Sequence, residues 1–131
     1  MTRKLILPVL VFSVLACNNQ AGYKKAEDAQ DAAREFIRAS LDGDYDKANF
    51  YLYADSTNQF LLERWKKNYT QLTLEERQLY KQANIIVLDN HAENDSVTKF
   101  RYLNTYKKDT TTIKILKLNG EWLVDLKEMI K

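Results

Sequence analysis

Apolar positions recur along this chain with two different periods, one in each half of the sequence. Between residues 27 and 82 they return every three or four positions, the spacing that gives a helix one buried face. Polar residues that can cap a helix precede three of these segments. We therefore predict four helices: residues 27–41, a short helix capped by Asp44, a third capped by Asp55, Ser56 or Thr57, and a fourth from Thr73 to about Gln82.

Local signals indicate where the helices begin and end, and which faces they bury. Gly43 is suited to the positive φ that terminates a helix, and Thr73 and Glu76 have the spacing of a capping box. The third and fourth helices are each expected to bury one row of large side chains. These rows are Phe60, Leu61, Arg64, Trp65 and Tyr69, and then Leu74, Arg77 and Tyr80.

After Asn84 the pattern changes to the period of two that is typical of β-strands. The segments NIIVLDN, SVTKFRYLNTY, TTTIKILKL and EWLVDLK predict four strands, and HAEND and KKD predict two of the turns. The third turn is Asn119–Gly120, a pair that suits the two positive φ angles of a tight hairpin. Helices followed by an antiparallel meander predict an α+β domain, with N-terminal helices packed on a four-stranded antiparallel sheet.

The first sixteen residues have a different organisation. Arg3 and Lys4 form a cationic start, residues 5–15 form an apolar run, and Ala16 is a small residue at its end. This combination is typical of a secretory signal peptide. The apolar run is shorter than the roughly 20 residues that cross a bilayer. We predict a cleaved leader over residues 1–16.

Cys17, the single cysteine of the chain, directly follows this leader. The sequence VLAC, residues 14–17, resembles the lipobox of bacterial lipoproteins. The resemblance implies a diacylglyceryl group on the Cys17 thiol, cleavage before Cys17, and acylation of the new amino group. Two or more acyl chains bind a membrane stably. The alternatives for Cys17 are a buried thiol in the core or half of a disulfide. A single cysteine cannot form a disulfide within the chain.

Three segments and a location follow from this interpretation. Residues 1–16 are the lipoprotein signal peptide, residues 17–25 a lipidated tether, and residues 26–131 the folded domain. The protein is expected in the cell envelope, lipid-anchored to a bacterial membrane on its periplasmic or surface face.

Charge and composition exclude several kinds of site. The chain has 20 Lys and Arg, of which the leader holds two, so 18 remain against 18 Asp and Glu. This balance, without a clustered basic face, does not predict a nucleic-acid partner. The only histidine, His91, lies in the predicted turn HAEND, and a zinc site needs several Cys or His ligands. We expect no metal and no cofactor.

Two stretches, FIRASLDGDYDKANFYL and LKLNGEWLVDL, resemble the nuclear-transport-factor-2-like, or cystatin-like, cone fold. Within that fold the chain is most similar to small uncharacterised bacterial lipoprotein domains, and the resemblance covers residues 25–131. It implies helices and a curved sheet around a pocket. The fold hosts enzymes, binding modules and interaction domains, so no function follows from it alone.

Aromatic residues of the sheet are the candidate functional residues. In the predicted strand SVTKFRYLNTY, alternation places the large residues on the same face as Thr98. The resemblance implies that two tryptophans lie near this face. Tyr and Trp combine a flat apolar surface with one hydrogen-bonding group, which suits ligands and protein partners, although the same residues can simply form the core. The candidates for a ligand or partner surface are Trp65, Phe100, Tyr102, Asn104, Tyr106 and Trp122.

Two classes of function remain, and the first of them has a variant. The favoured class is a membrane-anchored, non-enzymatic domain that binds a small apolar ligand or a protein partner, and the variant is an accessory subunit whose exposed sheet face pairs with another chain. The alternative is a cone-pocket enzyme acting on a small hydrophobic substrate. A buried carboxylate in an open pocket would favour the enzyme. No catalytic residue is expected, because alternation puts Asp125 on the face opposite Trp122, away from Tyr102.

Overall fold

The structure is a computed structural model that describes residues 22–130. The leader, Cys17 and the first part of the tether lie outside the described residues. The predicted α+β class is confirmed, with four helices before a four-stranded antiparallel sheet of order β1-β2-β3-β4. The elements are α1 (Ala29–Asp42), α2 (Tyr45–Phe50), α3 (Ser56–Thr70), α4 (Leu74–Gln82), β1 (Ile85–Asn94), β2 (Val97–Asn104), β3 (Thr111–Leu118), β4 (Glu121–Asp125) and a short 3-10 helix (Lys127–Met129).

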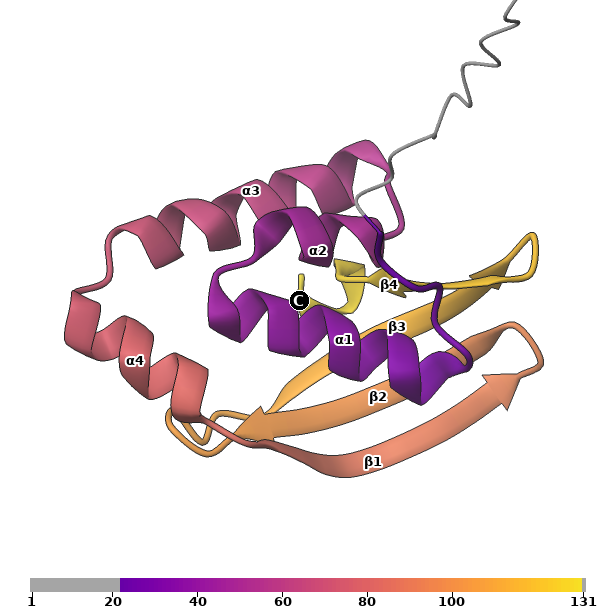
Figure 1. The fold of residues 1–131 in the computed structure, drawn as a ribbon. Coiled ribbons are helices and arrows are strands. Elements are labelled where there is room, and N and C mark those ends of the chain that lie inside the picture. The colour runs from indigo at the N-terminus through magenta and orange to yellow at the C-terminus, as the bar shows by residue number, and fades with distance from the viewer. Residues whose placement is uncertain (1–21, 131) are drawn as a thin grey trace, which may run out of the picture.

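The helices cover one face of the sheet (Figure 1). In this view α1 crosses in front of β2 and β3, α3 lies along the top with α2 below it, and α4 lies on the left. The helices α1 and α3 and the strand β2 all run from right to left, whereas β3 runs back to the right. The domain therefore has a left end, where α1, α3 and β2 finish, and a right end, where the N-terminal segment enters.

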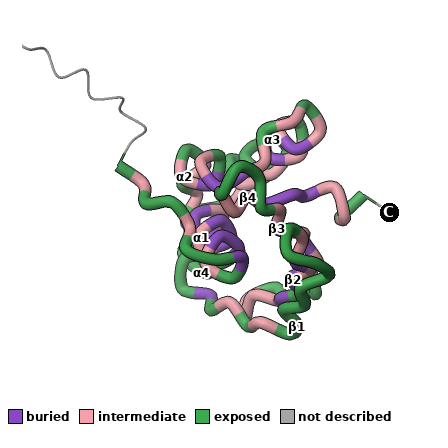
Figure 2. The backbone as a smooth tube through the Cα atoms, turned by 90° about the vertical axis from the view of Figure 1, so that its right-hand side faces the viewer, coloured by how far each residue is buried: buried purple, intermediate pink, exposed green. Residues whose placement is uncertain are grey.

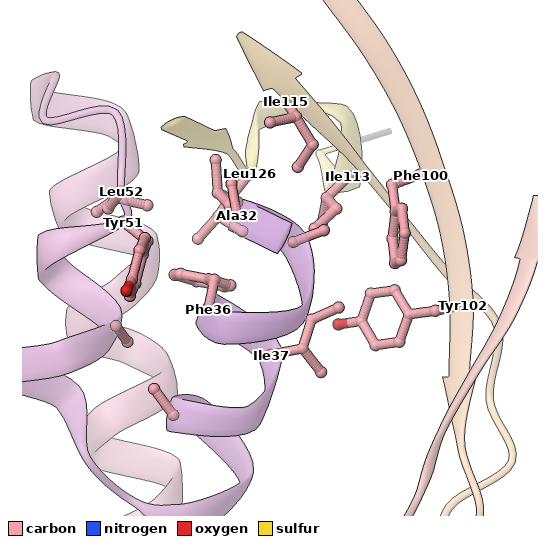
Figure 3. Packing of buried hydrophobic residues seen from close by; sticks show 14 of the residues in the cluster. Ala32, Phe36, Ile37, Tyr51, Leu52, Phe100, Tyr102, Ile113, Ile115 and Leu126 are labelled. Atoms are coloured by element: carbon pink, nitrogen blue, oxygen red, sulfur yellow. The ribbon is translucent and has the colours of Figure 1, made fainter. Parts of the chain in front are cut away.

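The core forms between α1 and the middle of the sheet. Ala32, Ala33 and Phe36 of α1 are fully buried, and so are Phe100 and Ile113 of the sheet. The alanines lack bulk, so the helix approaches closely, and Phe36 and the sheet residues fill the remaining space (Figure 3). Burial of each large apolar side chain contributes about 1.5–3 kcal/mol. Buried stretches of α1 and of β2 and β3 stand out as purple in Figure 2, whereas β1 is largely exposed.

Tyr51 and Leu52 follow the end of α2 and form a short parallel addition to the edge of β4. Leu52 forms a parallel bridge with Val124. The Val124 N–H donates to the Tyr51 carbonyl over 2.7 Å, and the Tyr53 N–H donates to the Val124 carbonyl over 2.8 Å. This pairing satisfies edge groups that β4 would otherwise leave without a strand partner.

The predicted buried face of α3 was wrong in part: Leu61 and Trp65 pack against the core, but Phe60 and Arg64 are exposed. Phe60 is 62% exposed, whereas Asn58 and Leu62 are buried. The centre of the core-facing side is formed by Asn58, Leu62 and Trp65, spaced as i, i+4 and i+7. Phe60 lies about 200° around the helix from Asn58. The pattern was misread because a polar residue, Asn58, occupies a core position. Leu74 of α4, 79% exposed, was also wrongly assigned to a buried face.

Two strand boundaries also differ from the prediction. β1 continues through most of HAEND, so His91 lies in a strand, exposed and paired with Lys99, and not in a turn. β2 ends at Asn104 because its side-chain oxygen accepts the backbone N–H groups of Tyr106 (3.1 Å) and Lys107 (2.8 Å). Such local side-chain bonds replace ladder bonds and begin a turn. Tyr106 therefore lies in the turn after β2.

The predicted hairpin at Asn119–Gly120 is confirmed, since both residues have positive φ, 50° and 77°. Gly120→Val is expected to lower the free energy of unfolding by about 1 kcal/mol, because a β-branched residue is strained at positive φ. Thermal unfolding followed by circular dichroism measures this. Gly120→Asn is the control, since Asn tolerates this region. A melting temperature equal to that of the wild type for Gly120→Val would contradict the prediction.

Candidate functional site

A cavity of about 260 Å³ opens at the left end of the domain, between the helices and the sheet. All four helices or their ends contribute to its wall, together with β2 and β3. Five of its lining residues are aromatic, so we name it the aromatic cavity. It is lined by Ile37, Ser40, Leu41, Tyr45, Trp65, Asn68, Tyr69, Leu72, Tyr80, Tyr102, Asn104 and Thr111.

Aromatic contacts fix the upper wall of the aromatic cavity. The Trp65 ring packs on the core residue Phe36, with ring centroids 5.8 Å apart. Tyr45 donates its hydroxyl hydrogen to the Trp65 carbonyl over 3.2 Å, and its ring meets Tyr69 edge-on at 5.9 Å. These contacts join α2 to α3, so three aromatic side chains from two helices are held in one orientation.

Arg38 holds α4, and with it Tyr80, against the end of α1. Its guanidinium donates to the carbonyls of Ala83 (2.7 Å), Lys81 (3.1 Å) and Tyr80 (3.2 Å). It also pairs with Asp42 at 3.0 Å. The planar guanidinium can serve several acceptors at once, which suits it to fixing a helix C-terminus. The Tyr80 ring is therefore placed at the cavity wall by contacts made outside the cavity.

The aromatic cavity presents polar groups that carry no charge. Among its lining residues in the described chain, none is Asp, Glu, His, Lys or Arg. Burial raises the pKa of Tyr102 and of Tyr45 well above the usual range, and it also raises the pKa of Tyr80. These hydroxyls stay protonated at neutral pH, where each can donate and accept a hydrogen bond.

The six candidate residues divide between different parts of the fold. Trp65, Tyr102 and Asn104 line the aromatic cavity together. Tyr106 lies behind its wall, edge-on to Tyr80 at 4.9 Å, and Phe100 is fully buried in the core. Trp122 lies elsewhere, at the right end of the domain.

Tyr45, Ser40 and Thr111 line the cavity but were not predicted from the sequence. Tyr69 and Tyr80 were predicted on buried helix faces but not as part of a site. The spacing of four between Trp65 and Tyr69 could have indicated that both face the same space. Nothing in the sequence around Tyr45 carried such a signal, because its position depends on contacts between α2 and α3.

A second hollow, which we name the tether groove, lies at the right end of the domain and has a volume of about 820 Å³. The N-terminal segment, the chain around α2 and the β3–β4 hairpin form its walls. Lys25 pairs with Glu121 across 2.6 Å, and Lys117 lies 5.3 Å from the centre of the Trp122 ring. Its aromatic walls are Tyr23, Phe50, Tyr51, Tyr53 and Trp122.

Asp125, the carboxylate considered as a partner for Tyr102, is committed to a structural network. Its Oδ1 accepts the Asn58 side-chain amide over 3.1 Å and the Lys127 N–H over 3.0 Å. Lys127 also pairs with Asp55 through its ammonium group, and this hydrogen bond lowers the pKa of Asp55 and raises that of Lys127. The network ties the start of α3 to the end of β4.

Two further kinds of feature are absent from residues 22–130. No group of three or more His, Cys, Asp or Glu side chains in this range is arranged to hold a metal ion. None of the helices in the same range has the length and apolar character needed to cross a membrane.

Helices packed on one face of an antiparallel sheet define an α+β domain. In this domain an uncharged aromatic cavity lies at one end of the sheet. No protein-family model and no curated protein matches the chain. Among solved structures the chain is similar to an NTF-2 like protein of unknown function from Shewanella oneidensis MR-1, with 14% identity and a TM-score of 0.49. The match covers 71% of this chain and 88% of the other. At this TM-score the likeness carries no argument about function.

Proposed function

We propose that this protein is a membrane-anchored lipoprotein of the cell envelope whose aromatic cavity binds a small uncharged ligand and leaves it chemically unchanged. The observation that carries the proposal is the composition of the cavity wall: Tyr and Trp rings with neutral polar groups between them. Pockets for small molecules typically combine an apolar lining with a few placed polar groups.

The wall indicates which class of ligand fits. A charged group would lose its hydration in the cavity, and none of the lining residues described above supplies an opposite charge, so charged ligands are disfavoured. Asn104 is held by two backbone N–H groups on its oxygen, which leaves its NH₂ group to donate. Ser40 donates to the Phe36 carbonyl over 2.9 Å, so its oxygen can accept. A single ring bearing one hydroxyl or carbonyl matches this set.

The enzyme alternative needs a general acid or base beside the ligand. The carboxylate that sequence analysis weighed for this role, Asp125, is held by Asn58 and Lys127. Burial raises the pKa of Tyr45 and of Tyr102, so both hydroxyls stay protonated at neutral pH and neither is available as a general base. These observations support binding over conversion.

Ligand binding can be tested with 3-fluorobenzyl alcohol, an uncharged single-ring probe, observed by ¹⁹F NMR. Ser40→Met adds bulk inside the cavity and is expected to weaken probe binding at least about tenfold, or about 1.4 kcal/mol. Arg34→Met, an exposed change on the same helix, is the matched control and should bind as the wild type does. Equal affinities for Ser40→Met and the wild type would exclude the cavity as the binding site.

Anchoring at Cys17 is tested separately in living cells. An alkyne fatty acid supplied during growth is expected to label the wild-type chain and not Cys17→Ser, because only a thiol accepts the diacylglyceryl group. The unlabelled variant should leave the membrane fraction or remain as precursor. A Cys17→Ser chain that is labelled as strongly as the wild type would refute the proposed anchor.

A further inference from the structure

The aromatic cavity and the tether groove lie at opposite ends of the domain. Thr111, in the wall of the cavity, and Leu118, in the wall of the groove, are the two ends of β3. Seven steps along the strand, at about 3.3 Å each, separate them by about 23 Å. In Figure 1 the cavity end is on the left, and the N-terminal segment enters at the groove end on the right.

The described part of the tether is attached to the groove end. Tyr23 packs on Phe50 with ring centroids 5.6 Å apart, and the Tyr51 hydroxyl donates to the Lys24 carbonyl over 2.6 Å. Lys25 pairs with Glu121 on the hairpin side. The chain is therefore fixed to the domain from Tyr23 onward, and five residues, or six steps from residue to residue, separate Tyr23 from Cys17.

The length of this connection limits where the domain can lie. Even fully extended, six steps from residue to residue span only about 20 Å. The lipidated cysteine of an anchored chain lies at the membrane surface, so the groove end must lie within that distance of it. The cavity end lies about 23 Å further along β3, so it is more distant from the anchor than the groove end is.

The groove end also has the residue types that favour a membrane interface. Tyr and Trp are enriched at the level of lipid headgroups because their rings are apolar and their edges polar. Tyr23, Tyr53 and Trp122 are half-buried there, and Leu118 at the hairpin tip is 37% exposed. Lys117 lies over the Trp122 ring and can approach anionic headgroups.

We propose that the groove end of the domain rests on the bilayer surface, with Trp122 and Tyr23 at headgroup level and the aromatic cavity opening away from the membrane. This inference rests on the proposed lipid anchor at Cys17. It means that ligands reach the cavity from the aqueous side, and that the lipid surface is the partner of the aromatic residues around Trp122.

The two tryptophans of the chain make a direct test, because Trp65 marks the cavity and Trp122 the groove. Lipidated protein is purified from membranes and reconstituted in vesicles of phosphatidylethanolamine and phosphatidylglycerol, with or without brominated phosphatidylcholine. Bromine quenches tryptophan emission only at close range. In Trp65→Phe all tryptophan emission comes from Trp122, and in Trp122→Phe it comes from Trp65. Should Trp65→Phe not fold, the emission of Trp122 is obtained as the difference between the wild type and Trp122→Phe.

We expect brominated lipid to reduce Trp122 emission about twofold and to leave Trp65 emission unchanged. Protein that floats with the vesicles but shows no quenching of Trp122, or stronger quenching of Trp65, would overturn the orientation while leaving the anchor intact. Wild-type protein that does not float with the vesicles would overturn the anchor itself, and the orientation with it.

Discussion

Asn58→Ala is expected to lower the free energy of unfolding by about 3 kcal/mol, the cost of leaving buried hydrogen-bonding groups without partners and opening a small void. Asn58 is fully buried at the start of α3. Its side-chain oxygen accepts the Leu126 N–H over 2.8 Å, and its side-chain NH₂ donates to Asp125 over 3.1 Å. One amide therefore serves a backbone donor and a carboxylate that are both buried.

The cost arises mainly at Leu126, because Asp125 keeps its bond from the Lys127 N–H. The Leu126 N–H is out of reach of bulk solvent, since Leu126 is also fully buried. Chemical denaturation at neutral pH measures the loss. Gln59→Ala is the matched control: Gln59 is the next residue along, its bond to Asn49 is exposed, and its loss should change stability by less than about 0.5 kcal/mol. Equal effects of the two substitutions would show that the Asn58 network does not stabilise the fold.

Asn58 also shows why part of this fold could not be predicted from sequence. The helix starts were predictable because a cap is a local bond, such as the Thr73–Glu76 capping box, which is present. The buried face of α3 was not, because its core position is filled by a polar side chain whose partners, Asp125 and Leu126, lie almost 70 residues away. Hydrophobic periodicity treats such a residue as exposed.

The candidate site was predictable in part, for a related reason. Strand alternation identifies which face of the sheet a residue occupies, and Tyr102 and Asn104 do face the helices. Alternation does not reveal position along the sheet. Trp122 lies on the same face as Tyr102 but at the other end of the domain, because it pairs with Lys117 near the hairpin whereas Tyr102 pairs with Thr111. Trp122 and Tyr102 therefore belong to different hollows.

The second large effect is expected at Gly43, which ends α1 with a φ of 77°. Gly43→Ala should lower the free energy of unfolding by about 3 kcal/mol, of which 1–2 kcal/mol is the cost of positive φ for a residue with a side chain. The remainder is steric. A β-carbon at this position would lie 2.4 Å from Cε1 of Tyr69, closer than any normal contact.

Tyr69 can relieve that contact only by leaving the wall of the aromatic cavity. Its ring packs edge-on against Tyr45 at 5.9 Å, and its hydroxyl donates to the Asp42 carbonyl over 3.4 Å. Displacing it breaks both contacts and reshapes the cavity. Gly43→Ala is therefore expected to weaken 3-fluorobenzyl alcohol binding as well as stability, whereas a substitution that affects only the backbone would change stability alone.

A matched pair of asparagine substitutions separates the steric effect from the backbone effect. Gly43 and Gly120 have the same φ of 77°, but a β-carbon on Gly120 meets no atom within 4 Å. Asn tolerates this backbone conformation, so Gly120→Asn should cost little. Gly43→Asn should still cost about 1–2 kcal/mol, because its β-carbon meets the Tyr69 ring as alanine would. Chemical denaturation of both variants, and of Gly43→Asn combined with Tyr69→Ala, measures the difference. If Gly43→Asn and Gly120→Asn lower the free energy of unfolding equally, the close approach of Tyr69 does not constrain residue 43. In that case the end of α1 does not fix the position of Tyr69 in the cavity wall.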